Sequence, residues 1–117
     1  MSIKIEVANS THKCYAKTIC KMMEEAAKIR GTGIAKRKPA YLEEKMAQEQ
    51  AIIALNDNEV IGFSYIESWE ELKYVAHSGL IVHPNFRKTG LAKAIKEAIF
   101  ELSKKKFPTS TIFGGLG

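Results

Sequence analysis

The alternation of apolar and polar residues changes its period along the chain. Residues 3–7 alternate strictly, which is typical of a half-buried strand. Between Tyr15 and Ile29 the apolar residues recur every three or four positions, and this spacing predicts a helix that ends at Gly31. The chain therefore begins with a strand followed by a helix.

The middle of the chain predicts a second helix and three strands. Pro39 suits the first turn of a helix, and the turn residues 56–58 between two apolar runs indicate a β-hairpin. Gly62 within that hairpin suggests a bulge or a close backbone approach. A polar, acidic connection at 67–71 precedes the next apolar run. The expected elements are a helix at 39–50 and strands at 51–55, 60–66 and 73–82.

The last third predicts a helix and a short strand. Gly90 opens a segment with apolar residues spaced by four, three and four positions, so a helix is expected to about Lys106, with Pro108 as its stop. Residues 109–113 predict a final strand. The element order is β-α-α-β-β-β-α-β, and a length of 117 residues fits a single domain over 1–117.

Composition narrows the function classes only slightly. Apolar residues make up 45% and charged residues 26% of the chain, values typical of a soluble globular protein. No apolar run approaches the ~20 residues of a membrane span, and the N-terminus lacks the apolar core of a signal peptide, so a cytoplasmic protein is expected. The net charge of +5 fits an anionic cofactor, an acidic substrate or nucleic acid. Aromatic residues do not interleave with the cations, which disfavours nucleic acid.

The clearest functional signal in the sequence lies between the strand expected at 73–82 and the last helix. An apolar run stops at His83-Pro84, a turn follows, and Arg87, Lys88 and Gly90 stand where the helix begins. The first amides of a helix have no partner within it, and that end carries partial positive charge. A glycine there lets a ligand approach the backbone closely. The junction therefore predicts a phosphate or pyrophosphate site.

The spacing of this stretch adds a family resemblance. The pattern Leu80-x-Val82-x-Pro84 is followed in register by Arg87-x-x-Gly90-x-Ala92. This resembles the acetyl-CoA-binding motif of the GNAT superfamily of N-acetyltransferases, whose element order the chain matches as far as the fifth strand. The resemblance implies an α/β (α+β) GNAT fold, with a mixed, mostly antiparallel sheet flanked by helices.

In that family the pantetheine arm of acetyl-CoA pairs with the backbone of the fourth strand, and the pyrophosphate sits on amides of the following turn. The resemblance assigns the first role to Leu80 and Val82, with Gly79 as a bulge where the strand splays. The implied cofactor-binding residues are Leu80, Ile81, Val82, Arg87, Lys88, Thr89, Gly90, Leu91 and Ala92. Acetyl-CoA is thus the implied co-substrate, and no metal is expected.

The implied reaction is transfer of an acetyl group to a primary amine of a small molecule, which needs a base for the amine proton. A base on the fourth strand would share the face of Leu80 and Val82. Strict alternation places Ala76 and Ser78 there and His77 on the other face, unless a bulge at Ser78-Gly79 shifts the register. The candidate catalytic residues are His77, Ser78, Glu67 and Glu70.

Two loops line the acceptor site in this fold, here the basic stretch 30–38 and the acidic stretch 67–71. An amino acid would suit them, with its carboxylate toward Arg30, Lys36 or Arg37 and its amine toward Glu67 or Glu70. The family places its acid, a tyrosine, on a helix after the fifth strand. The chain stops before it, so a truncated domain lacking the C-terminal helix and strands is expected.

Such a truncation leaves a sheet edge unpaired, and a homodimer that covers this edge is one expectation. Two alternatives to an active enzyme stay open at this stage. The first is an acetyl-CoA-binding or structural remnant without catalysis, and the second is a small basic nucleic-acid-binding module.

Overall fold

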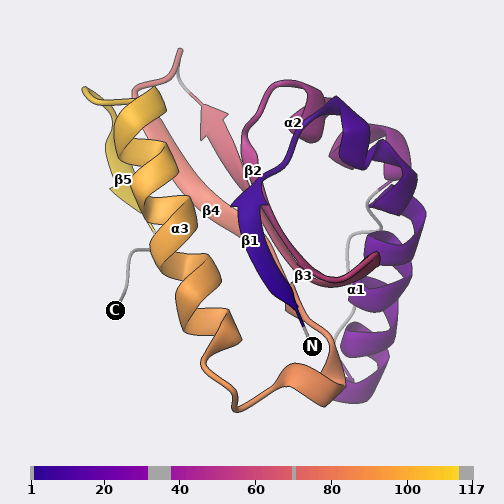
Figure 1. Cartoon of the computed structure of the whole chain (residues 1–117). Helices are drawn as coiled ribbons and strands as arrows, with labels where there is room; N and C mark the ends of the chain where they lie inside the picture. Colours follow the sequence, from indigo (N-terminus) through magenta and orange to yellow (C-terminus); the bar gives the residue numbers. More distant parts are fainter. Residues whose placement is uncertain (1, 32–37, 70, 114–117) are drawn as a thin grey trace.

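The structure, a computed structural model, describes residues 2–31, 38–69 and 71–113. A curled five-stranded sheet lies between two helical layers (Figure 1). Helices α1 (Ala16–Arg30) and α2 (Pro39–Ala47) cover one face, and α3 (Leu91–Lys106) crosses the other. The predicted α/β class and element order are confirmed. The basic stretch 32–37 and Glu70 lie outside the described residues.

The strands agree with the sequence pattern in number and differ from it in length. A 3-10 helix, η1 (Ser10–Tyr15), precedes α1, and α2 ends three residues before the predicted Gln50. The third strand extends to Trp69, so Glu67 belongs to it and not to a connection. None of the described helices is long and apolar enough to cross a bilayer. The strands are β1 (Ile3–Val7), β2 (Ala51–Asn56), β3 (Glu59–Trp69), β4 (Tyr74–Val82) and β5 (Thr111–Phe113).

The strand order in the sheet is the order along the chain, β1-β2-β3-β4-β5. The first three pairings are antiparallel, and only β4 and β5 are parallel. This last pairing joins Tyr74–Ala76 to Thr111–Phe113. From His77 to Val82, the outer edge of β4 therefore has no neighbouring strand among the described residues. The sheet is mixed and mostly antiparallel, as predicted.

Each face of the sheet buries its own apolar core because side chains alternate along the strands. Ile53, Phe63 and Tyr65 are fully buried beneath α1 and α2. Ile61, Ile66 and Val75 are fully buried beneath α3 on the opposite face. Gly62 makes close packing on that side possible, since a Cβ there would lie 2.5 Å from Cδ1 of Ile95. The close approach predicted at Gly62 is confirmed.

A bulge in β4 interrupts its alternation. Phe63 pairs with Ile81, but Tyr65 pairs with Ser78, so β4 has one residue more than β3 in this interval. Gly79 lies in the extra segment with φ of +64°, a left-handed backbone that favours glycine. The Ser64 hydroxyl donates to the Ser78 carbonyl at 3.0 Å, which occupies an acceptor at the irregular pairing. The bulge predicted at Gly79 is confirmed.

The bulge has no room for a side chain, which leads to a stability prediction. A Cβ on Gly79 would overlap the Tyr65 ring, whereas a Cβ on Gly31, which also has positive φ, meets nothing within 4 Å. Gly79→Ala should lower the free energy of unfolding by about 2–4 kcal/mol through strain and overpacking. Gly31→Ala should cost about 1 kcal/mol, because it carries the backbone term alone.

Urea unfolding followed by circular dichroism measures both variants against the wild type. Equal losses in the two glycine variants would show that the packing of Tyr65 against the bulge contributes nothing.

Candidate functional site

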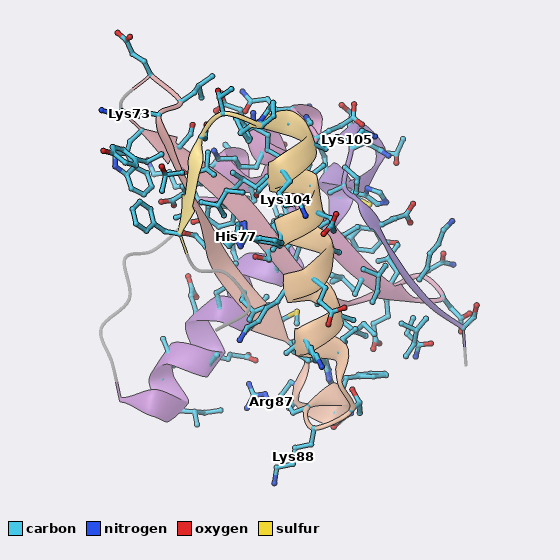
Figure 2. All side chains as sticks on the ribbon, turned by 90° about the vertical axis from the view of Figure 1, so that its left-hand side faces the viewer. Lys73, His77, Arg87, Lys88, Lys104 and Lys105 are labelled. Atoms are coloured by element: carbon cyan, nitrogen blue, oxygen red, sulfur yellow. The ribbon has the colours of Figure 1, made fainter. Side chains whose placement is uncertain are left out.

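The turn between β4 and α3 is held by its own side chains. A short 3-10 helix, η2 (Pro84–Phe86), is followed by Thr89, whose hydroxyl donates to the Phe86 carbonyl at 2.5 Å. Lys88 has φ of +64° and Gly90 has φ of +88°, so the chain reverses sharply before the helix. This places the exposed Lys88 side chain outward, as Figure 2 shows for Lys88 and Arg87.

Gly90 is the N-cap of α3 and offers no side chain to the first helical amides. The backbone amides from Lys88 to Ala92 donate no hydrogen bond to a described residue outside the helix. Because the amides at a helix start are strong donors with partial positive charge, this end can receive an anion. The anion site predicted from the sequence therefore has suitable geometry.

Two adjoining clefts open beside this turn. One of about 430 Å³ runs between α1 and the end of β4, and one of about 270 Å³ lies above the start of α3. Both clefts are lined by apolar side chains together with the cation Arg87, and charged residues such as Glu25 also line the larger one. The residues common to the two clefts are Ala26, Ile29, Ile81, Val82 and Arg87.

Several predicted cofactor residues meet in these clefts, and others do not. Leu80 and Ala92 line the smaller cleft together with the common residues. Lys88 and Thr89 are exposed on the turn and line neither of these two clefts. Leu91 is 6% exposed and packs into the core under α3, where it holds the helix in place.

Sequence reasoning missed the contribution of α1 to these clefts. Ile29 is 75% exposed and lines both of them, although periodicity placed it on the packing face of the helix. An apolar residue that lines an open cleft has the same spacing as one that fills a core. No signal in the sequence could separate the two, because the difference depends on where β4 ends relative to α1.

The bulge at Gly79 changes the faces that strict alternation predicts. Ser78 pairs with Tyr65 on the α1/α2 face, and Ala76 pairs with Glu67 on the same face. Val82 lies on the α3 face with Val75. The expectation that Ala76 and Ser78 share the face of Val82 is wrong, because the extra residue shifts the alternation by one position.

His77 is consequently on the α3 face. Its Nε2 atom lies 2.8 Å from Oγ of Ser103, which is fully buried in α3. The Phe100 ring meets the imidazole edge to face, with 6.2 Å between centroids. Figure 2 shows His77 beside α3, near the level of Lys104 and away from the turn that carries Arg87 and Lys88.

Glu67 lies on the opposite face and belongs to a polar cluster. The Tyr65 hydroxyl donates to its carboxylate at 2.9 Å. Tyr41 of α2 meets the Tyr65 ring edge to face at 5.7 Å, and the Lys45 ammonium is 5.6 Å from the centre of the Tyr41 ring. Burial lowers the pKa of Lys45, while the charges of Glu67 and Glu44 act in the opposite direction. A half-exposed carboxylate that is held by a hydrogen bond is oriented to bind a cationic group of a ligand.

Other predicted site residues cannot be placed. Glu70 and the loop cations Lys36 and Arg37 lie outside the described residues, as does the side chain of Arg30. Among the residues that the structure describes, no three His, Cys, Asp or Glu side chains come together as metal ligands would.

The chain matches a family described as "Acetyltransferase (GNAT) family" over residues 21–112. A comparison with the sequences of curated proteins finds no match. Among solved structures, one similar protein is N-acetylglutamate synthase from Neisseria gonorrhoeae, complexed with coenzyme A and N-acetyl-glutamate. It is 18% identical with a TM-score of 0.69, and the match covers 90% of this chain and 23% of the synthase. The chain thus spans about a quarter of that protein.

Two further structures have the same fold. A Staphylococcus aureus protein assigned to the GNAT family is 22% identical with a TM-score of 0.66, and the match covers 94% of this chain and 98% of that one. Diaminobutyrate acetyltransferase from Paenibacillus lautus, in complex with L-2,4-diaminobutyric acid and coenzyme A, is 11% identical with a TM-score of 0.66. The match covers 85% of this chain and 57% of that enzyme.

Gly90 offers a test of the anion site that separates charge from backbone strain. Its φ is positive, and a Cβ there would meet nothing within 4 Å. Asn and Asp both tolerate such a backbone and have similar shapes, so Gly90→Asn and Gly90→Asp differ mainly in one negative charge. Gly90→Asp should bind acetyl-CoA about tenfold more weakly than Gly90→Asn, a difference of about 1.4 kcal/mol. Isothermal titration at low salt measures this difference, and equal affinities of the two variants would contradict the placement.

The polar cluster offers a second test. The negative charges of Glu67 and Glu44 both raise the pKa of Lys45, and Glu67 has the larger effect. Glu67→Gln removes that effect, so the pKa of Lys45 should fall further below its usual value. Glu44→Gln should lower this pKa by less, and Glu97→Gln, on the exposed side of α3, should leave it unchanged. NMR titration of the lysine side-chain signals measures the order, and a pKa of Lys45 that does not move in Glu67→Gln would refute the proximity of the two groups.

Proposed function

This chain belongs to the acetyltransferase (GNAT) family, and from that premise we propose that it transfers an acetyl group from acetyl-CoA to a primary amine of a small molecule. The observation that carries the proposal is the pair of adjoining clefts at the end of β4. Five residues of the motif line these clefts, namely Leu80, Val82, Pro84, Arg87 and Ala92. The edge of β4 that has no neighbouring strand among the described residues leads from them toward the level of Glu67.

The cofactor fits this edge in a simple way. Its pyrophosphate takes the amides between Lys88 and Ala92, with Arg87 as a cation at the rim. Its pantetheine arm follows the backbone of Leu80 and Val82, where the described residues provide no other strand. Backbone recognition explains why the exposed side chains of Lys88 and Thr89 need not touch the ligand. Structures of similar proteins with bound coenzyme A support this choice of ligand.

Glu67 is the base that we assign to the acceptor side. A protonated amine cannot attack a thioester, because its lone pair is occupied, so a carboxylate within reach must take the proton. Tyr65 fixes the carboxylate by a hydrogen bond, and Ser78, paired with Tyr65, lies on the same face of the sheet. Glu67 therefore faces the acceptor from the side of α2 while the cofactor lies along the edge.

An α-amino acid is the acceptor that suits the described charges best. Lys45 of α2 can hold a carboxylate while Glu67 receives the ammonium group, because the two residues interact across the same face. The similar structures with N-acetyl-glutamate and with L-2,4-diaminobutyric acid support this class of substrate. The amine and the carboxylate of one small molecule would then bridge α2 and β3.

Thiol release from acetyl-CoA, followed with a chromogenic disulfide and a panel of amino acids, tests the reaction. Glu67→Gln should lower kcat by about 10²- to 10³-fold, because it removes the base. The Kd of acetyl-CoA should stay at the wild-type value, since the carboxylate lies away from the clefts.

The matched control is Glu97→Gln, which makes the same change on the exposed side of α3 and should keep wild-type kcat. Wild-type protein that binds acetyl-CoA without releasing thiol with any amine would instead establish a binding protein without turnover. Full activity in Glu67→Gln would exclude Glu67 as the base.

A further inference from the structure

Acetyl transfer also needs a proton on the cofactor side. When the C–S bond breaks, both electrons of the bond go to sulfur, and a thiolate leaves. An alkyl thiolate is a poor leaving group near neutral pH because the pKa of its thiol is about 8.5, so a positioned acid speeds its departure. We propose that His77 is this acid and that Ser103 positions it. The inference rests on the proposed acetyl transfer and assigns a second residue to it.

The bulge at Gly79 separates the two proton-transfer groups. Without the extra residue, His77 would lie on the face of Ile81, with α1 and α2. With it, His77 pairs with Ile66 and faces α3, whereas Glu67 and Ser78 face α2. A ligand that lies in the plane of the sheet, along the edge of β4, thus has a carboxylate on one side and an imidazole on the other.

His77 lies on the part of β4 that leads away from the clefts. Five residue steps, about 17 Å of extended strand, separate it from Val82 at the clefts. A pantetheine arm that enters at the turn and follows this edge carries its thioester toward His77.

The surroundings of His77 hold its ring in place. On α3, Ser103 is fully buried and bonds to Nε2, and Phe100 packs against the ring. Lys104 of the same helix has its ammonium 5.2 Å from the centre of the Phe100 ring. On β3, the partner Ile66 is apolar, and on β5, Ile112 and Phe113 are apolar. An imidazole held by a hydrogen bond and a ring contact suits directed proton transfer.

The proposed step balances. The amine lone pair forms a bond to the carbonyl carbon, and the C–S bond breaks with its electrons on sulfur. Before this step, Glu67 takes one proton from the ammonium group and passes it to water, which frees the lone pair. As the bonds change, a ring nitrogen of His77 gives its proton to that sulfur, and the carboxylate of Glu67 takes the second proton that the nitrogen loses. Exchange with water restores both groups, so the products are the amide and coenzyme A with a free thiol.

His77→Gln tests the role of the imidazole, because glutamine can still bond to Ser103 but cannot serve as an acid. With acetyl-CoA, kcat should fall by about 10²-fold or more. With the acetyl thioester of 4-nitrothiophenol, whose thiolate leaves without protonation, the ratio of wild-type to variant kcat/KM should approach one. Ser103→Ala should show the same dependence on the leaving group with a smaller loss, as expected for a positioning residue.

The pH profile gives a second readout. Wild-type kcat, at saturating acetyl-CoA and amine, should decline on the alkaline side as the acid loses its proton, and His77→Gln should lack this decline. Equal losses with the two thioesters, or an alkaline decline retained in His77→Gln, would overturn the assignment. Urea unfolding of His77→Gln should match the wild type.

Failure of the proposed acetyl transfer can be told apart from failure of the role assigned to His77. A wild-type protein that releases no thiol with any amine removes the proposed function and this inference with it. An active wild type and an equally active His77→Gln variant remove only the inference.

Discussion

The left-handed backbone at Gly79, packed against the ring of Tyr65, is the constraint on which the site depends. The extra residue in β4 reverses its side-chain alternation between Ser78 and Ile81. The Tyr65 ring occupies the space that a Cβ would take, and the hydroxyl of the same tyrosine holds Glu67. One side chain therefore fixes both the shape of the open strand and the carboxylate beside it.

Helix α3 contributes to the core through its apolar stripe and to the proposed cofactor site through its first turn. Its apolar stripe buries Ile95 and Ile99 against the sheet, and Gly62 allows it to approach closely. Its first turn has no side-chain cap, and Ala92 of this turn lines the smaller cleft. Because packing fixes the helix axis, the amides at its start have a fixed direction, and an anion can bind there without reorganising the turn.

The two proton transfers of the proposed reaction take place on opposite faces of the sheet. In this proposal Glu67, Tyr65 and Lys45 form the acceptor side beneath α2. His77 and Ser103 form the cofactor side beneath α3. A thioester placed between the faces meets one group that takes a proton and one that gives it. This separation keeps the two protons from being exchanged directly between the acid and the base, so each group can act on its own atom of the reaction.

The sequence by itself determined the element order, the strand–turn–helix junction and the family. Hydrophobic period, glycine, proline and a spaced motif are local signals, and they identified Arg87, Gly90 and the bulge at Gly79. Only the tertiary structure decided that His77 faces Ser103, that Ile29 lines a cleft and that Lys45 lies near Glu67. Those relations join segments distant in the chain. The direction of a side chain in β4 depends on how many residues the neighbouring strand supplies opposite it, and no local pattern contains that count.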